Sequence, residues 1–153
     1  MTERKKRNKG FFHEHSLSLV AAAILVTWIL LYWRSDPQTH LGSFFGNAVA
    51  DWTGLVVAVL ATKGLFEAGS AESKLPPKHY LAPISDFVVR HSLSIFLAIT
   101  GVAWIVLFAR VDAQSKWGQV VGNIVSEWTQ LLGMVLLSKK LIERGSKESK
   151  KDS

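Results

Sequence analysis

Four long apolar runs dominate the chain. Ser16–Trp33 and Ser92–Ala109 each contain 18 residues without a formal charge, and Leu41–Thr62 and Trp117–Ser138 each contain 22 residues with a single charge. At 1.5 Å per residue, 18 helical residues cover roughly 27 Å, close to the bilayer hydrocarbon thickness of about 30 Å. The pattern therefore predicts four membrane-spanning helices and an all-α fold, an integral membrane four-helix bundle.

A soluble helical bundle and a signal peptide both fit these runs less well. A soluble bundle would need a polar stripe along each helix, yet Ile24–Trp33 contains only Thr27 as a polar break. A signal peptide would need a site of the small-x-small type after the first run, and Tyr32–Pro37 offers none. We therefore expect the first run to be a spanning helix as well.

The chain contains an internal repeat. An offset of 76 residues aligns His15–Lys74 with His91–Lys150 without a gap, and nearly half of the aligned pairs are identical. Each repeat contains two predicted spans, so both repeats insert in the same orientation. The expected fold is a tandem duplication of a helical hairpin with a pseudo-two-fold axis along the membrane normal, not an inverted repeat.

The repeat also predicts where the tails, the two hairpins and the linker begin and end. These are a basic tail (1–9), a first hairpin (10–69), a Pro-containing linker (70–85), a second hairpin (86–145) and a charged tail (146–153). The linker contains three prolines and is expected to be extended.

Capping residues predict where the helices begin and end. Asp36 is suited to be the N-cap of the second helix with Pro37 at its first position, and Asp86 is suited to cap the third helix. The second helix is expected to end near Ala68, with Gly69 as its left-handed C-cap and Gly145 in the same role in the second repeat.

Basic residues predict the orientation. With a cytoplasmic N-terminus, 15 Lys and Arg lie on the inside and only three on the outside, namely Arg34, Arg110 and Lys116. Basic residues favour the cytoplasmic side of membrane proteins. We therefore expect a multi-pass protein of the cytoplasmic (inner) membrane with both termini in the cytoplasm.

Small residues recur every four positions along the second span. They form a ridge that consists of Gly42, Gly46, Ala50, Gly54 and Ala58. Such ridges let membrane helices approach closely, because packing has to replace the hydrophobic drive that lipid removes. In the second repeat the ridge begins with Gly118, Gly122 and Ser126 and ends at Gln130 and Met134. The ridge predicts close helix packing, and it predicts a homo-oligomer because exposed small-residue ridges favour partners.

Polar residues near the middle of the second and fourth spans form the main candidate site. Asn47 and Asp51 are four residues apart, as are their repeat mates Asn123 and Glu127. A charge at the bilayer centre costs about 2.5–3.5 kcal/mol on insertion scales. By depth, the indoles of Trp28 and Trp104 are level with the two asparagines and are candidate donors to them.

Two functions are open for this candidate site. In one, the acids are protonated and act as hydrogen-bonding glue in a helix-packing or partner-binding membrane component. In the other, the paired carboxylates and amides bind a monovalent cation or carry protons in a small channel or transporter.

A second candidate cluster lies at the cytoplasmic ends of the spans. By depth, His15 is level with Lys63 and Glu67, and His91 is level with Lys139 and Glu143. This cluster is expected to anchor the helix ends through interfacial hydrogen bonds. The alternative is a pH-sensitive gate, because histidine titrates near neutral pH.

Composition and motifs exclude several further classes. The 153-residue chain has 48% hydrophobic residues, a net charge of +6 and no cysteine, which rules out disulfides and Cys-ligated metal centres. The motifs of phosphate-binding loops, dinucleotide sites, zinc proteases and serine hydrolases are missing from the sequence. His13-Glu14-His15 resembles a metal-binding triplet, but the second repeat has Val89-Arg90-His91 at these positions and keeps only the last histidine. We expect no enzyme activity, catalytic residue, metal or cofactor, and no nucleic-acid binding, since topology explains the basic run Arg4–Lys9.

The phrases Ser-Leu-Ser-Leu from Ser16 and Gly69–Lys74, echoed at Gly145–Lys150, resemble a family of small bacterial membrane proteins. That family is a domain of unknown function built from two such hairpins, so the resemblance implies architecture and location but no activity. A second similarity, to low-affinity iron permease-type proteins, rests on Trp28, Asp36, Gln38 and Asn47. The rest of that pattern is missing, and no substrate is carried over.

Overall fold

The computed structural model describes residues 12, 15–72 and 83–141. Every regular element in these ranges is an α-helix. The helices are α2 (Ser16–Arg34), α3 (His40–Gly64), α4 (Pro83–Arg90), α5 (Ser92–Phe108) and α6 (Lys116–Leu137). The predicted all-α class is confirmed.

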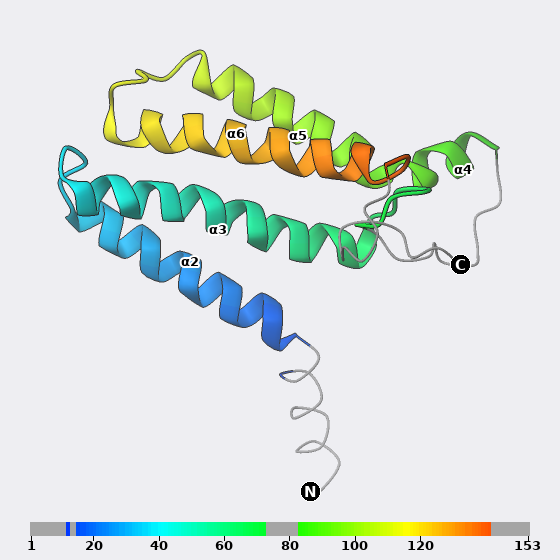
Figure 1. Ribbon diagram of the computed structural model, residues 1–153, viewed down its shortest axis with the longest axis horizontal. Coiled ribbons are helices and arrows are strands. Elements are labelled where there is room, and N and C mark those ends of the chain that lie inside the picture. Colours follow the sequence, from blue (N-terminus) through cyan, green and yellow to red (C-terminus); the bar gives the residue numbers. More distant parts are fainter. Residues whose placement is uncertain (1–11, 13–14, 73–82, 142–153) are drawn as a thin grey trace, which may run out of the picture.

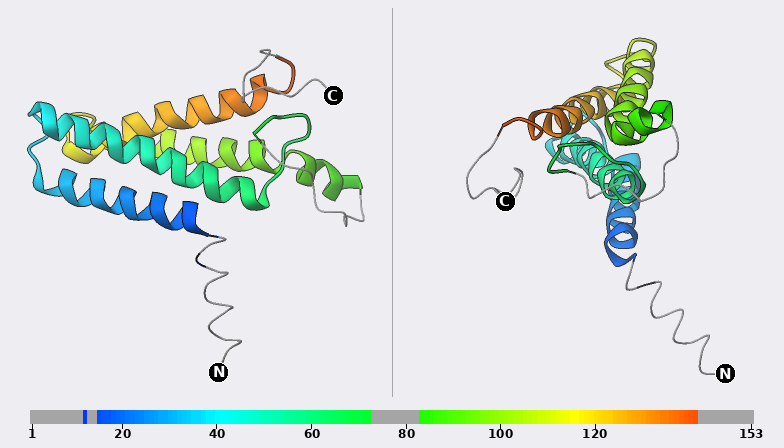
Figure 2. Two further views of the ribbon diagram at one scale, coloured as in Figure 1. Left: turned by 60° about the horizontal axis from the view of Figure 1, so that its bottom comes forward. Right: turned by 90° about the vertical axis from the view of Figure 1, so that its right-hand side faces the viewer.

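The helices form two antiparallel hairpins, α2–α3 and α5–α6. In Figure 1 they lie in the order α5, α6, α3, α2, so α3 and α6 are the inner helices and α2 and α5 flank them. The chain runs in the same direction along α3 and α6, and both hairpin turns lie at the same end of the molecule. Figure 2 shows the same neighbours from two other sides.

The hairpin turns have the same chemistry in both repeats. The hydroxyl of Thr39 accepts a hydrogen bond from the backbone N–H of Gly42 at 3.0 Å, and Ser115 accepts one from Gly118 at 3.0 Å. The predicted cap at Asp36 is therefore wrong by three residues. The Asp36 carboxylate accepts a hydrogen bond from the N–H of Gln38 at 2.9 Å, which holds Pro37 in the turn and delays the start of α3 to His40.

The end of α3 also differs from the prediction. The helix ends at Gly64 rather than near Ala68, and Leu65 is already extended. The reason is a competing set of partners: the Ser92 hydroxyl lies 2.8 Å from the backbone N of Phe66, and Ala68 N–H donates to Arg90 O at 2.6 Å. Gly69 does have a left-handed backbone (φ 90°), but it turns the chain after this segment and does not cap the helix. Gly145 lies outside the described residues.

A short helix precedes the third span. α4 begins at Pro83, within the linker for which the three prolines predict an extended conformation. Asp86 lies in its first turn and pairs with Arg90 at 2.8 Å, so it does not cap α5. Residues 73–82 of the linker and the two tails (1–9 and 146–153) lie outside the described residues.

In the part of the chain that the structure describes, three helices are long and apolar enough to cross a membrane: α2, α3 and α6. α5 is equally apolar but has 17 residues. Large apolar side chains such as Val20, Leu30, Ile99 and Val102 point outward from α2 and α5 and are exposed. The structure therefore supports a membrane protein.

The small-residue ridge is used inside the chain. A Cβ atom at Gly46 would lie 2.9 Å from the ring of Tyr32 on α2, and at Gly54 the nearest atom is a carboxylate oxygen of Glu127 on α6, at 3.4 Å. Ala50 is completely buried between them. Gly42, Gly46, Ala50 and Gly54 are thus occupied by intramolecular packing, with Ala58 half-buried. A contact between two copies of the chain would have to use a surface other than these four residues.

Candidate functional site

The polar residues predicted near the middle of the spans meet their own repeat mates. The Asn123 side-chain amide donates to the Asn47 carbonyl oxygen at 2.6 Å, across the contact between α3 and α6. One turn further along, the carboxyl groups of Asp51 and Glu127 lie close to each other across the same contact. Two carboxyl groups at short range cannot both ionise cheaply, so the pair favours a shared proton.

The two helices do not cover these four residues equally. Asn47 and Asp51 are exposed on α3, whereas Asn123 and Glu127 are half-buried on α6. The acid pair is therefore covered from the side of α6 and open along α3. In a membrane this open side is unfavourable unless something polar covers it.

The predicted tryptophan partners of this site are not its donors. The buried indole N–H of Trp28 has no hydrogen-bond partner among the described residues, so the predicted bond from Trp28 to Asn47 is wrong. Trp28 packs instead on the rings of Phe44 and Phe45, while Asn47 turns towards α6. Trp104 packs on the ring of Trp128, with centroids 5.7 Å apart.

A different tryptophan makes the hydrogen bond inside the second hairpin. Trp128 donates its indole N–H to the Thr100 hydroxyl at 2.8 Å, joining α6 to α5. The repeat contained the signal for this residue, since Trp52 and Trp128 are identical mates. The hydrogen-bond partner of Trp128 could not be found by comparing the repeats, because Thr100 stands where the first repeat has Ile24.

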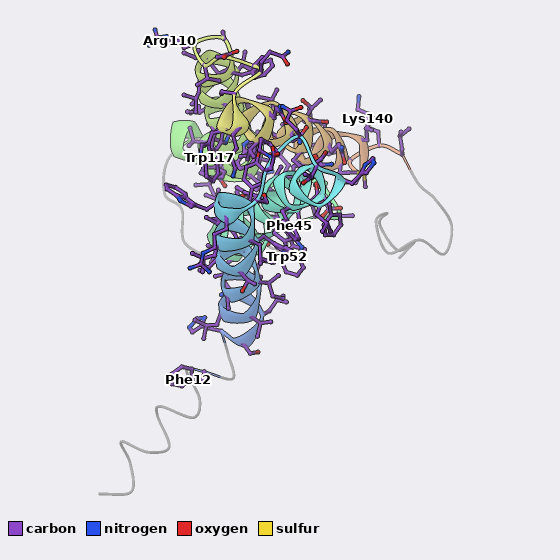
Figure 3. All side chains as sticks on the ribbon, turned by 90° about the vertical axis from the view of Figure 1, so that its left-hand side faces the viewer. Phe12, Phe45, Trp52, Arg110, Trp117 and Lys140 are labelled. Carbon is purple, nitrogen blue, oxygen red and sulfur yellow. The ribbon has the colours of Figure 1, made fainter. Side chains whose placement is uncertain are left out.

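The ends of the two hairpins that carry the turns contact each other around Lys116. Its ammonium group donates to the backbone oxygen of Trp33 at 3.0 Å, and its own carbonyl accepts the hydroxyl of Tyr32. The ring of Trp117 packs edge-on against Tyr32 at 5.3 Å, and Figure 3 shows it where α6 meets the end of α2. In the same view Arg110 projects away from the helices.

The cluster predicted at the cytoplasmic ends of the spans forms with a different pairing from the predicted one. Glu67 is completely buried, forms an ion pair with Lys139, and lies 2.6 Å from His91 Nδ1. Its second oxygen accepts the backbone N–H of Ser94 at 3.1 Å. The first-repeat residues His15 and Lys63 pair with each other at 3.2 Å. Glu143 lies outside the described residues.

The early end of α3 explains this exchange of partners. Depth along a continuous helix places Glu67 beside His15, but the chain leaves the helix at Gly64 and carries Glu67 to the second hairpin. Ser70 follows the same path, with its hydroxyl 2.9 Å from that of Ser138 after α6. The segment after α3 therefore joins the two repeats at the end opposite to Lys116.

The ion pair gives the Glu67 carboxyl an unusual titration. Burial opposes its ionisation, but hydrogen bonds from its three partners outweigh burial and hold its pKa below the ordinary value. Ionised Glu67 therefore stabilises the fold fully above the ordinary glutamate pKa, and this contribution is lost as the pH falls through the lowered pKa. We expect wild-type stability to fall more steeply with acidification than that of Glu67→Gln. Unfolding midpoints in detergent between neutral and strongly acidic pH measure the difference, and parallel curves would contradict it.

No family model, curated protein or solved structure matches this chain. Its function is therefore inferred from the geometry above.

The two hairpins also differ in how tightly they are filled. An apolar groove of about 390 Å³ lies between α5 and α6, with Leu97, Gly101, Trp128 and Gly133 among its lining residues. The mates of Gly101 and Gly133 in the first hairpin are Leu25 and Val57, which pack against the core. Larger side chains thus stand in the first hairpin where glycines line the groove in the second.

The site has the chemistry of proton sharing and hydrogen bonding. Its described groups are amides, carboxyls and indoles, and among the described residues no group of three or more His, Asp or Glu side chains is arranged to hold a metal ion. Such groups can join helices, hold a proton, or coordinate a monovalent cation.

Proposed function

We propose that this protein is a membrane component that packs with a partner in the bilayer, with polar pairs at mid-depth acting as hydrogen-bonding glue between its inner helices. The observation that carries the proposal is the pairing of Asn47 with Asn123, together with the pairing of Asp51 with Glu127. All four side chains are used to join α3 to α6.

The proposal includes four crossings of the cytoplasmic membrane with both termini inside. The 17 residues of α5 cover roughly 26 Å, which is close to the hydrocarbon thickness. α5 is also antiparallel to α6 and lies beside it, so it shares the depth of a helix that is long enough to span. The excess of basic residues at one end supports the orientation.

Partner binding follows from the polar groups that remain uncovered. Asn47 and Asp51 are exposed although they belong to the middle of a spanning helix. Polar side chains in spanning helices face other helices or water-filled cavities rather than lipid. A partner that covers α3 would satisfy this requirement.

A second candidate function is a proton or monovalent-cation pathway. One observation favours it: the Asp51 carboxyl is exposed while it lies beside that of Glu127. An accessible carboxyl that shares a proton with a covered one can exchange that proton or coordinate a cation. Asn47 and Asn123 would complete such a site one turn away.

Two double variants separate these functions. In Asp51→Asn/Glu127→Gln the two amides can still hydrogen-bond, so we expect the stability of the wild type and no change in flux. In Asp51→Leu/Glu127→Leu the bond is lost, and we expect a loss of about 0.6–2 kcal/mol, the range for hydrogen bonds between membrane helices. Stability is measured by unfolding in detergent, and proton and cation flux in proteoliposomes.

The flux assay decides between glue and pathway. Wild-type flux above that of empty liposomes, abolished in the folded Asp51→Asn/Glu127→Gln variant, would contradict the glue proposal and establish the pathway. Equal stability of all three proteins without flux would contradict both.

A further inference from the structure

The contact between the inner helices joins two different faces. α3 contributes its small-residue face, where Ala50 and Gly54 are buried. α6 contributes the face that carries Glu127 and Leu131: a Cβ atom at Gly54 would lie 3.4 Å from a Glu127 oxygen and 3.8 Å from Leu131 Cδ1. We call these the small face and the acid face. The α3–α6 contact is therefore small face to acid face.

Each inner helix carries both faces, because the repeats align. On α6 the residues equivalent to Ala50 and Gly54 are Ser126 and Gln130, and both are exposed. On α3 the residues equivalent to Glu127 and Leu131 are Asp51 and Leu55, and both are exposed as well. The chain thus has one complete contact of this type and the two exposed halves of another, with Asp51 also lying beside Glu127 of the first contact.

We propose that two copies of this chain close a ring of four inner helices, in which the small face of α6 in each copy packs on the acid face of α3 in the other. This inference rests on the proposed function and names its partner, a second copy. The two new contacts would pair the same helix positions as the α3–α6 contact, with Ser126 and Gln130 in place of Ala50 and Gly54, and Asp51 in place of Glu127.

The geometry of the helices favours closure at two copies. Around a helix with 3.6 residues per turn, the mean directions of the Ala50–Gly54 and Asp51–Leu55 faces differ by about 100°. A ring of four helices needs roughly 90° between the two contact faces of each helix, whereas a filament needs about 180°. α3 and α6 also run in the same direction, as a rotational ring in a membrane requires.

The flanking helices leave room for this ring. Gly46 faces Tyr32 of α2, and its direction around α3 is about 60° from the small face and about 160° from the acid face. Gly122 faces Phe108 of α5 in the same way. α2 and α5 lie at opposite ends of the helix order in Figure 1, so both would surround the ring from outside.

The chemistry of the two unused faces is complementary. Gln130 carries an amide donor, Ser126 a hydroxyl donor and Asp51 carboxyl oxygens. By the equivalence of the repeats, Gln130 of one copy would meet Asp51 and Leu55 of the other. The exposed polar groups of a single chain would then be covered, and asparagines and acids from four helices would surround one axis.

The natural absence of cysteine makes the contact testable by disulfide trapping. In Gln130→Cys/Leu55→Cys, oxidation in native membranes should shift the chain from 17.0 kDa to twice that mass on non-reducing gels. Each single variant should remain monomeric, because the two copies of one position lie across the ring. Gly54→Cys/Leu131→Cys is the matched control for the contact within one chain. Its disulfide should keep the two hairpins joined after cleavage at a protease site placed within 73–82.

The outcomes separate the ring from the proposed function. Joined hairpins in the control without a dimer in Gln130→Cys/Leu55→Cys would overturn the ring and leave the α3–α6 pairing intact. Separate hairpins in the control would overturn that pairing and the proposed function with it. A ladder of trimers and larger species would also overturn the ring, because it would show that the contact does not close at two copies.

Discussion

Replacing Glu67 with alanine is expected to lower the free energy of unfolding by about 3 kcal/mol, near the lower end of the range for removing one partner of a buried ion pair. The side chain of Glu67 is completely buried, while those of Lys139 and His91 are 23% and 31% exposed. Water can therefore reach the two cations once the carboxylate is gone, which keeps the effect from being larger. Unfolding in mixed micelles, followed by tryptophan fluorescence, measures it.

Lys63→Ala is the matched control for this prediction. Lys63 lies at the same end of α3 and contacts His15 and Ser18, but it is exposed. Exposed polar contacts of this kind contribute about 1 kcal/mol or less. Equal and small effects of Glu67→Ala and Lys63→Ala would show that Glu67 does not hold the two hairpins together.

Replacing Gly42 with alanine is expected to destabilise the first hairpin by about 1–3 kcal/mol or more, the range for overpacking. The added Cβ would lie 1.8 Å from the carbonyl oxygen of Asp36, a backbone atom that cannot move without opening the turn. The cap from Thr39 to Gly42 would be strained by the same movement. Gly118→Ala should have a similar effect, since its Cβ would lie 2.0 Å from Asp112 O.

Gly133→Ala should have the opposite sign. Among the described residues nothing lies within 4 Å of a Cβ at Gly133, and replacing a helical glycine with alanine gains about 0.5–1 kcal/mol. Thermal or denaturant unfolding of Gly42→Ala, Gly118→Ala and Gly133→Ala under one condition measures these differences in stability. A loss at Gly133 as large as that at Gly42 would contradict the steric argument.

The sequence could predict the helices and the members of the candidate site, because both depend on local patterns. Apolar runs locate α2, α3 and α6 within a few residues, and the offset between the repeats identifies Asn47, Asp51, Asn123 and Glu127. The direct contacts between repeat mates do not follow from the pattern. They depend on α3 and α6 being neighbours, which is a property of tertiary packing.

The partners of Glu67 show most clearly where local reasoning ends. Depth along a continuous helix places Glu67 beside His15. Nothing in the residues 65–68 predicts an extended segment, because its backbone groups are satisfied by Ser92 and Arg90, far along the chain. The same applies to Trp28, which packs on aromatic neighbours instead of bonding to the nearby amide.

The hydrogen bond between Asn47 and Asn123 has a consequence for how two hairpins of this kind can associate. A bond between two identical side chains on a two-fold axis cannot obey the symmetry, because one amide donates and the other accepts. In an assembly of two identical hairpins, both directions would have equal energy and would interchange. In the fused chain the neighbours differ, with Asp51 one turn from the acceptor and Glu127 one turn from the donor. Joining the two hairpins in one chain therefore removes this degeneracy and gives the polar core a fixed polarity that two separate identical hairpins would not have.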